Sequence, residues 1–159
     1  MALRCSDVTI GRCLFTNSQY GVNLDNCSNA VLYNIESSYN RIGMLTNASS
    51  FTLSNSLIHH NTQQGGIRHY GSSNRQGIIE GCTLVNNSYG NSSYLGYGGA
   101  ITGSSDYLTI HDSILWGNSP GAIPEPDYSD YTLRYCCVQD LLAVENLRFA
   151  RFIAFGCDQ

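Results

Sequence analysis

The sequence predicts an all-β fold in which the chain winds into a parallel solenoid of about five to six coils. Short runs of strand period recur along it, separated by corners rich in Gly, Asn and Ser. Their spacing is nearly constant, since 22 residues separate Ile10 from Leu32 and 21 separate Leu32 from Leu53. Repeats of this length are typical of solenoids. No window has a convincing helical period before the tail, which predicts a solenoid over residues 1–140 and a tail over residues 141–159.

The repeat is clearest between residues 51 and 74, which make one full unit with three apolar runs. These runs are residues 51–53, 57–58 and 66–67. Three short strands cannot enclose a core alone. Stacked coils can, because each strand then pairs with its equivalent one coil away, at roughly 4.8 Å.

Five units share this order and a partial sixth follows. Their first runs are residues 8–10, 30–32, 51–53, 77–79, 108–110 and 131–133. Each of the five full units also carries an Asn after its second run: Asn17, Asn40, Asn61, Asn87 and Asn118. Stacked coils would bring these amides into an Asn ladder that bonds along the axis and satisfies backbone groups at the corner.

The tail over residues 141–159 could form a helix that caps the solenoid. Leu141, Val144 and Leu147 could line one helical stripe. An open solenoid end exposes unpaired strand edges, so it needs a cap or a partner. The N-terminal end offers no cap signal, which predicts either a fragment or end-to-end association with a second copy.

Composition limits the classes of partner. The chain has 8 Arg, no Lys and 12 acidic residues, for a formal net charge of -4. Without a basic patch, nucleic acid is not expected as a partner. No apolar run reaches the length of a membrane span, and the first ten residues lack the apolar segment of a signal peptide. We therefore expect either a cytosolic chain or a fragment whose export signal is missing.

Seven Cys residues are present, an odd count, and none forms a CxxC pair. No His lies at metal-ligand spacing from a Cys, so a zinc site is not expected. Cys13, Cys82 and Cys136 occupy the same place in the repeat as Ser56 and Ser113. This predicts small buried free thiols rather than disulfides.

The repeats resemble those of right-handed parallel β-helix proteins, the pectate-lyase-like solenoid superfamily. The resemblance covers roughly residues 7–139. The similarity lies in the recurring residue pattern V-T-I, C, N, G-I, S-S-N and in the segment Ser-Ile-Leu-Trp-Gly-Asn-Ser at residues 113–119. It implies a single-stranded right-handed β-helix, a secreted or cell-surface location, a bacterial source and association with polysaccharide.

The resemblance also sets out what catalysis would need. Lyases of this family pair carboxylate-held calcium with an Arg or Lys base, and its hydrolases use several close Asp residues. This chain has no Asp-Asp pair, no Gly-His-Gly and no Lys. Catalysis is therefore not evident. If the protein were an enzyme, it would be a polysaccharide lyase or a glycoside hydrolase.

Candidate substrate contacts lie on the outward positions of the third runs. If Ile67 points inward, Arg68 and Tyr70 point outward, and Asp25 shares their face. The neighbouring coils would add Thr46 (or Leu45 in its place) and Thr102. These positions would suit a shallow sugar-binding groove, in which Arg68 contacts a carboxylate or hydroxyls, although exposed polar residues on a sheet favour the alternative given next. The alternative is a solvated sheet face with no ligand.

A second candidate surface is the insertion at residues 88–97. It holds Tyr89, Tyr94 and Tyr97. Aromatic rings stack on sugar CH groups, so a Tyr-rich loop on a solenoid edge could contact a glycan. The alternative is that the rings pack down to order a Gly-rich loop.

The remaining polar pairs predict no site. His59 and His60 are adjacent, and adjacent strand residues point to opposite faces, which makes a poor metal site. His111 and Asp112 are adjacent too, and Asp112 could orient the His111 imidazole for acid/base work, but adjacent residues seldom face each other, so an exposed corner is expected instead. No metal and no cofactor are predicted, with calcium as the exception for a lyase-like protein.

Three functional hypotheses follow. The first is a carbohydrate-associated β-helix module that binds polysaccharide. The second is a structural or adhesive solenoid without catalysis, or an assembly fragment of a larger surface protein. The third is a divergent polysaccharide lyase.

Overall fold

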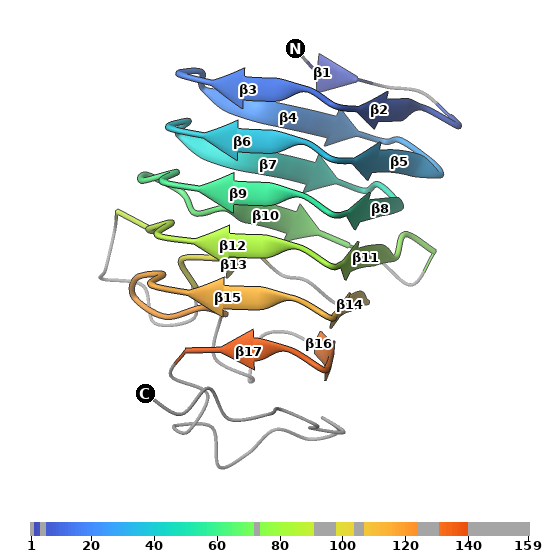
Figure 1. The fold of residues 1–159 in the computed structure, drawn as a ribbon. Helices are drawn as coiled ribbons and strands as arrows, with labels where there is room; N and C mark the ends of the chain where they lie inside the picture. The colour runs from blue at the N-terminus through green and yellow to red at the C-terminus, as the bar shows by residue number, and fades with distance from the viewer. Residues whose placement is uncertain are drawn as a thin grey trace.

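The computed structural model confirms an all-β parallel solenoid of about five turns. It describes residues 2–3, 6–71, 74–90, 98–103, 107–123 and 131–139. Within these ranges every regular element is a strand and no helix occurs. The coils stack from β1 (Ala2–Leu3) to β17 (Cys137–Val138), as Figure 1 shows from the side. The predicted capping helix falls on residues outside the described ranges.

Equivalent strands of successive coils form three parallel sheets. The first sheet contains β2 (Thr9–Gly11), β5 (Ala30–Tyr33), β8 (Phe51–Ser54), β11 (Gly77–Glu80), β14 (Leu108–His111) and β16 (Tyr131–Arg134). The second contains β3 (Leu14–Thr16), β6 (Glu36–Ser38), β9 (Leu57–His59), β12 (Thr83–Val85), β15 (Ile114–Trp116) and β17. The third contains β1, β4 (Tyr20–Asp25), β7 (Ile42–Asn47), β10 (Ile67–Tyr70) and β13 (Ile101–Thr102).

The predicted register of the repeats is confirmed. In the first sheet Ile10 pairs with Leu32, Leu32 with Leu53, and Leu53 with Ile79. The inward positions of the second sheet form a parallel ladder: Phe15, Ser37, Ile58, Leu84, Leu115 and Val138. Stacking equivalent side chains gives a hydrophobic core that the buried polar Ser37 interrupts in the second coil. Truncating a buried Leu or Ile of this core to Ala costs roughly 2–5 kcal/mol.

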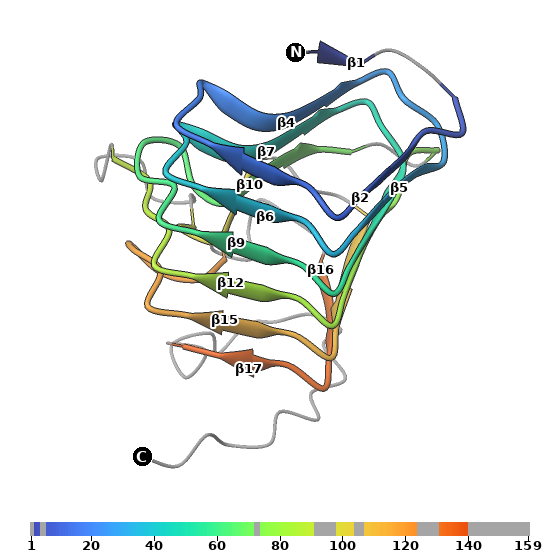
Figure 2. The ribbon, with the colours of Figure 1, turned by 45° about the horizontal axis from the view of Figure 1, so that its top comes forward.

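Single residues with positive φ turn the first sheet into the second. These first-corner residues are Arg12, Asn34, Asn55, Gly81, Asp112 and Tyr135, with φ between 48° and 58°. One left-handed residue bends the chain abruptly, and Asn, Asp and Gly adopt that conformation at least cost. Figure 2 shows the corner at which the two sheets meet in each coil.

A second left-handed corner follows the second sheet. Its residues are Asn17, Tyr39, His60, Asn86 and Gly117. Directly after it, Asn40, Asn61, Asn87 and Asn118 form the Asn ladder. Asn61 Oδ1 accepts a hydrogen bond from the backbone N–H of Asn40 at 2.9 Å, and Asn61 Nδ2 donates to Ser37 O at 3.0 Å. Asn87 and Asn118 repeat this pattern in the next coils.

Asn17 does not belong to this ladder, which differs from the prediction. Asn17 is exposed and is itself the left-handed corner residue. Ser18 takes the ladder place in the first coil, where its backbone N–H donates to Asn40 Oδ1 at 3.0 Å. Asn is favoured both at the left-handed corner and at the ladder position that directly follows it. The residue type alone therefore could not show which of the two positions Asn17 occupies.

The column of small side chains inside the first corner also appears as predicted. Cys82 Sγ donates to Glu80 O at 3.2 Å, and Ser113 Oγ donates to His111 O at 2.8 Å. Cys13, Cys82 and Cys136 are free thiols. The expectation of free thiols is wrong for Cys137, which is disulfide-bonded.

Candidate functional site

A shallow groove of about 690 Å³ follows the solenoid axis beside the first corner. One wall is the row of first-corner residues Arg12, Asn34, Asn55 and Gly81. The other is the outward row of the second sheet, Leu14, Glu36, Leu57 and Thr83. We call this feature the corner groove. It spans four coils, or about 14 Å at the spacing of paired strands.

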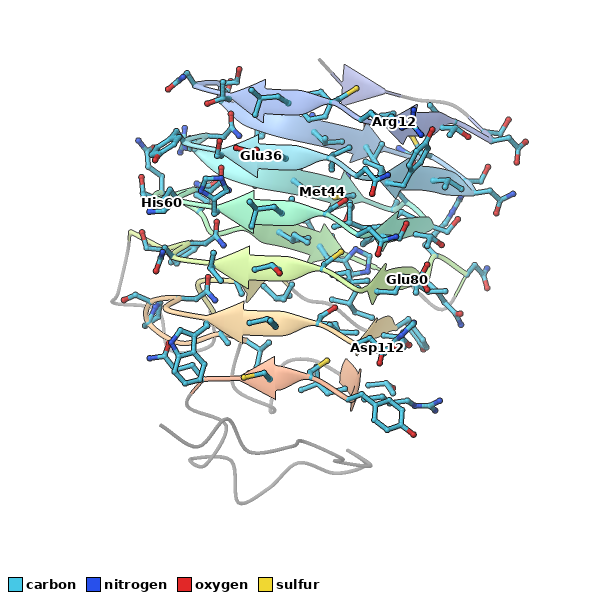
Figure 3. The ribbon with its side chains drawn as sticks, viewed as in Figure 1. Arg12, Glu36, Met44, His60, Glu80 and Asp112 are labelled. Carbon is cyan, nitrogen blue, oxygen red and sulfur yellow. The ribbon has the colours of Figure 1, made fainter. Side chains whose placement is uncertain are left out.

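The lining of the corner groove is mixed in character. Among its described lining residues, Arg12 and Glu36 carry charge, and Figure 3 shows both side chains on the side of the solenoid that faces the viewer. The amides of Asn34 and Asn55 each offer two N–H donors and an acceptor oxygen. Leu14, which is 62% exposed, adds apolar surface. The groove therefore offers hydrogen bonds in both directions beside a patch of hydrocarbon.

Glu36 links the corner groove to a second group of polar side chains. Its Oε1 lies 3.1 Å from His59 Nε2, and His59 Nδ1 lies 2.8 Å from His60 Nδ1. The ring of Tyr39 stacks on that of His60, with centroids 5.3 Å apart and planes 21° apart. We call Glu36, Tyr39, His59 and His60 the histidine cluster. In Figure 3 Glu36 lies on the second sheet and His60 at its left edge.

The two imidazoles face each other because the strand has already ended. His59 is the last residue of β9, and His60 is a left-handed corner residue with φ 52°. Alternation of side chains between faces holds only along an extended strand. The expectation that the two rings point to opposite faces is therefore wrong.

The same geometry brings His111 and Asp112 together on the fifth coil. His111 ends β14, and Asp112 has φ 52°. His111 Nδ1 lies 2.8 Å from Asp112 Oδ2, while its Nε2 lies 3.5 Å from Glu80 Oε2. The corner is partly exposed, as predicted, but the pair is in direct contact. The imidazole lies between two carboxylates.

Asp25, Arg68 and Tyr70 share the outer face of the third sheet. In β10, Ile67 is buried while Arg68 and Tyr70 are partly exposed. Arg68 lies over the Tyr70 ring, with its guanidinium carbon 5.1 Å from the ring centroid, and Arg68 Nη1 donates to Gln64 Oε1 at 2.8 Å. The guanidinium is thus already held by two neighbours.

Thr46 and Thr102 do not extend that face as a sugar-binding surface. Leu45, rather than Thr46, pairs with Arg68, and Thr46 points into the core opposite His69. Thr102 is in register with Arg68 but is fully buried. A register difference of one residue moves a side chain to the other face of a sheet. The choice between Leu45 and Thr46 therefore needed the observed pairing.

Of the insertion tyrosines, Tyr89 lies within the described residues. Its backbone N–H donates to Ser119 O at 2.9 Å, and it bridges Gln64 on the coil before. Tyr94 and Tyr97 lie outside the described residues. The predicted glycan contact of this loop stays a prediction.

Sequence reasoning missed the corner groove and the histidine cluster. A signal for the groove was present, since Arg12, Asn34, Asn55 and Gly81 each stand directly before a residue that points inward at the first corner. Within the described part of the chain, no group of three or more His, Cys, Asp or Glu side chains is arranged to hold a metal ion. No described helix is long and apolar enough to cross a membrane.

The family model described as "Right handed beta helix region" matches residues 1–115. No curated protein and no solved structure matches the chain significantly.

Proposed function

The chain belongs to the right-handed β-helix family, and on that premise we propose that it is a polysaccharide-binding module whose ligand lies along the corner groove. The observation that carries the proposal is the groove itself. It runs parallel to the axis across four coils and is lined by Arg12, Glu36 and two side-chain amides. An extended glycan has a matching shape and presents hydroxyls along its length.

The chemistry of the walls supports a hydroxylated ligand. The amides of Asn34 and Asn55 can donate to and accept from sugar hydroxyls. Arg12 offers a planar set of N–H donors that suits a carboxylate, and Leu57 and Leu14 offer apolar surface to sugar CH groups. The proposal includes a location outside the cytosol, with which the disulfide at Cys137 agrees.

A glycan-array screen, with and without calcium, tests the proposal. We expect an acidic or neutral polysaccharide to bind, and Arg12→Asn to weaken that binding by at least tenfold. Asn replaces Arg without strain at this left-handed position (φ 56°). Arg41→Asn is the matched control, because Arg41 is exposed and does not line the groove.

Two results would argue against the corner groove. One is binding that survives Arg12→Asn but is lost in Arg68→Ala, which would place the ligand on the outer face of the third sheet. The other is no binding to any glycan. Ultraviolet detection of unsaturated product on each positive glycan tests the third hypothesis, a divergent lyase, in the same experiment.

A structural or adhesive solenoid is the second candidate function. Large apolar side chains stand exposed on the outer face of the second sheet, among them Ile114 at 46% and Trp116 at 39%. Exposed apolar groups of this kind favour contact with another protein surface. A silent glycan array together with self-association in sedimentation experiments would support this candidate.

A further inference from the structure

We propose that His59 and His60 form a chelating site for a divalent transition-metal ion, with copper(II) or nickel(II) as the fitting ions. The spacing of the two donor atoms suits a chelate. The two Nδ1 atoms are 2.8 Å apart. Two metal–nitrogen bonds of about 2.0 Å at an angle of about 90° span about 2.8 Å between the nitrogens.

A carboxylate orients the ring of His59. Glu36 Oε1 accepts a hydrogen bond from His59 Nε2 at 3.1 Å. A carboxylate on the remote nitrogen fixes the imidazole tautomer and makes the other nitrogen more basic, the arrangement that metal-ligating histidines usually have. With Nε2 protonated, a neutral His59 presents its Nδ1 lone pair toward His60.

The ring of His60 is contacted by two neighbouring rings and is open on its other side. Tyr39 stacks on it at 5.3 Å, and His59 meets it edge to face at 5.0 Å. His60 lies at a corner, at the edge of the solenoid in Figure 3. In the hydrogen-bonded pair each Nδ1 points at the other, so chelation requires both rings to turn about χ2, a soft torsion, until their lone pairs meet at one point.

The metal ion takes the place of a proton. In the metal-free pair, a proton on one Nδ1 is donated to the other Nδ1. When both imidazoles are neutral, that proton belongs to His60, and metal binding moves it through solvent to His60 Nε2. Both Nδ1 atoms are then free to coordinate, and no other bond changes.

The spacing also selects among metal ions. Glu36 and His60 contact opposite nitrogens of His59, so Glu36 is not a third ligand, in keeping with the lack of any three-residue metal group in the described residues. Water must fill the remaining positions. A tetrahedral site would need nitrogens about 3.3 Å apart, whereas a tetragonal site accepts a pair near 90°. Copper(II) and nickel(II) prefer the latter.

Titration calorimetry with copper(II) and nickel(II) chloride tests the proposal on the full chain. We expect His60→Asn and His59→Val each to weaken binding by at least tenfold. The repeat already uses these residues at the same places, since Asn86 and Val85 follow one coil later, so both variants should fold. Glu36→Gln should weaken binding by about 10–100-fold, as loss of such an orienting group usually does.

His111→Asn is the matched control, because His111 also ends a strand beside a left-handed residue but faces two carboxylates. It should leave the affinity unchanged. Electron paramagnetic resonance of the copper(II) form should show coupling to two nitrogens in the parent and one in His60→Asn. Equal affinity of the parent and His60→Asn, or zinc bound as tightly as copper, would overturn the proposal.

Discussion

His69 and Thr46 meet inside the solenoid, where His69 Nδ1 lies 2.6 Å from Thr46 Oγ1 and both side chains are fully buried. The His69 ring also packs edge to face on Phe51, with centroids 5.5 Å apart. Its Nε2 is buried without a hydrogen-bond partner among the described residues. An imidazolium could not be solvated there, and this burial lowers the pKa of His69 to about 4.

The buried histidine predicts that the fold is less stable in acid. The folded-state pKa lies below the unfolded value of 6.5, so the unfolded chain binds the proton more readily. The stabilisation is fully present above pH 6.5 and is lost as the pH falls toward 4, by about 3 kcal/mol in all. Urea denaturation at pH 7, 5.5 and 4 measures this. The decrease in the free energy of unfolding between pH 7 and pH 4 should be smaller in His69→Leu and unchanged in His111→Asn.

Removing one ladder amide should be costly. Asn61→Ala leaves the buried N–H of Asn40 and the carbonyl of Ser37 without the partners that Asn61 provides. We expect a loss of about 2–4 kcal/mol in the free energy of unfolding, measured with urea. Asn17→Gly is the control, since Asn17 lies outside the ladder at a left-handed corner. It should change stability by less than about 1 kcal/mol. Equal losses would argue against the assignment of Ser18 to the ladder.

Close stacking of coils predicts that Gly43 cannot be enlarged. A Cβ at Gly43 would lie 2.5 Å from Gly66 O and 2.7 Å from Asn61 Nδ2, both in the next coil. Gly43→Ala should therefore lower the free energy of unfolding by about 1–3 kcal/mol or more. Gly121→Ala, where nothing lies within 4 Å of the added carbon, should be close to neutral. Thermal melts of both variants give the comparison.

The buried thiols should resist alkylation. Burial raises the pKa of Cys82 to about 11 and also raises that of Cys136. Because the thiolate is the reactive form, iodoacetamide at pH 8 should modify Cys82 and Cys136 only after unfolding. Cys13 is partly exposed and should react sooner. Peptide mass spectrometry over time resolves the three sites. Rapid labelling of Cys82 in the native protein would contradict its burial.

Two corners bring adjacent polar residues into contact, against the expectation from the alternation of side chains along a strand. His59 meets His60, and His111 meets Asp112, at 2.8 Å in both cases. In each pair the first residue ends a strand and the second has φ 52°. Because the second residue is left-handed, the two side chains no longer alternate between opposite faces of the strand and can point toward each other. A polar pair that straddles such a corner should therefore be expected in contact.

The sequence by itself determined the solenoid, because the repeat of apolar runs can be buried only by stacking equivalent strands. It determined the register of Ile10, Leu32 and Leu53, and four of the five ladder positions. These features depend on the spacing of apolar residues and on the residue types at the corners, and both can be read within a single repeat unit.

Tertiary structure decided the rest. The corner groove joins side chains from four coils, and the histidine cluster joins Glu36 to a histidine pair one coil later. Two assignments depended on the register between neighbouring coils to within one residue. One is whether Leu45 or Thr46 faces outward, and the other is whether Asn17 or Ser18 occupies the ladder position. The repeat pattern in the sequence does not decide the register to one residue, because the contacts that stabilise one register over another form between coils and not within a single coil.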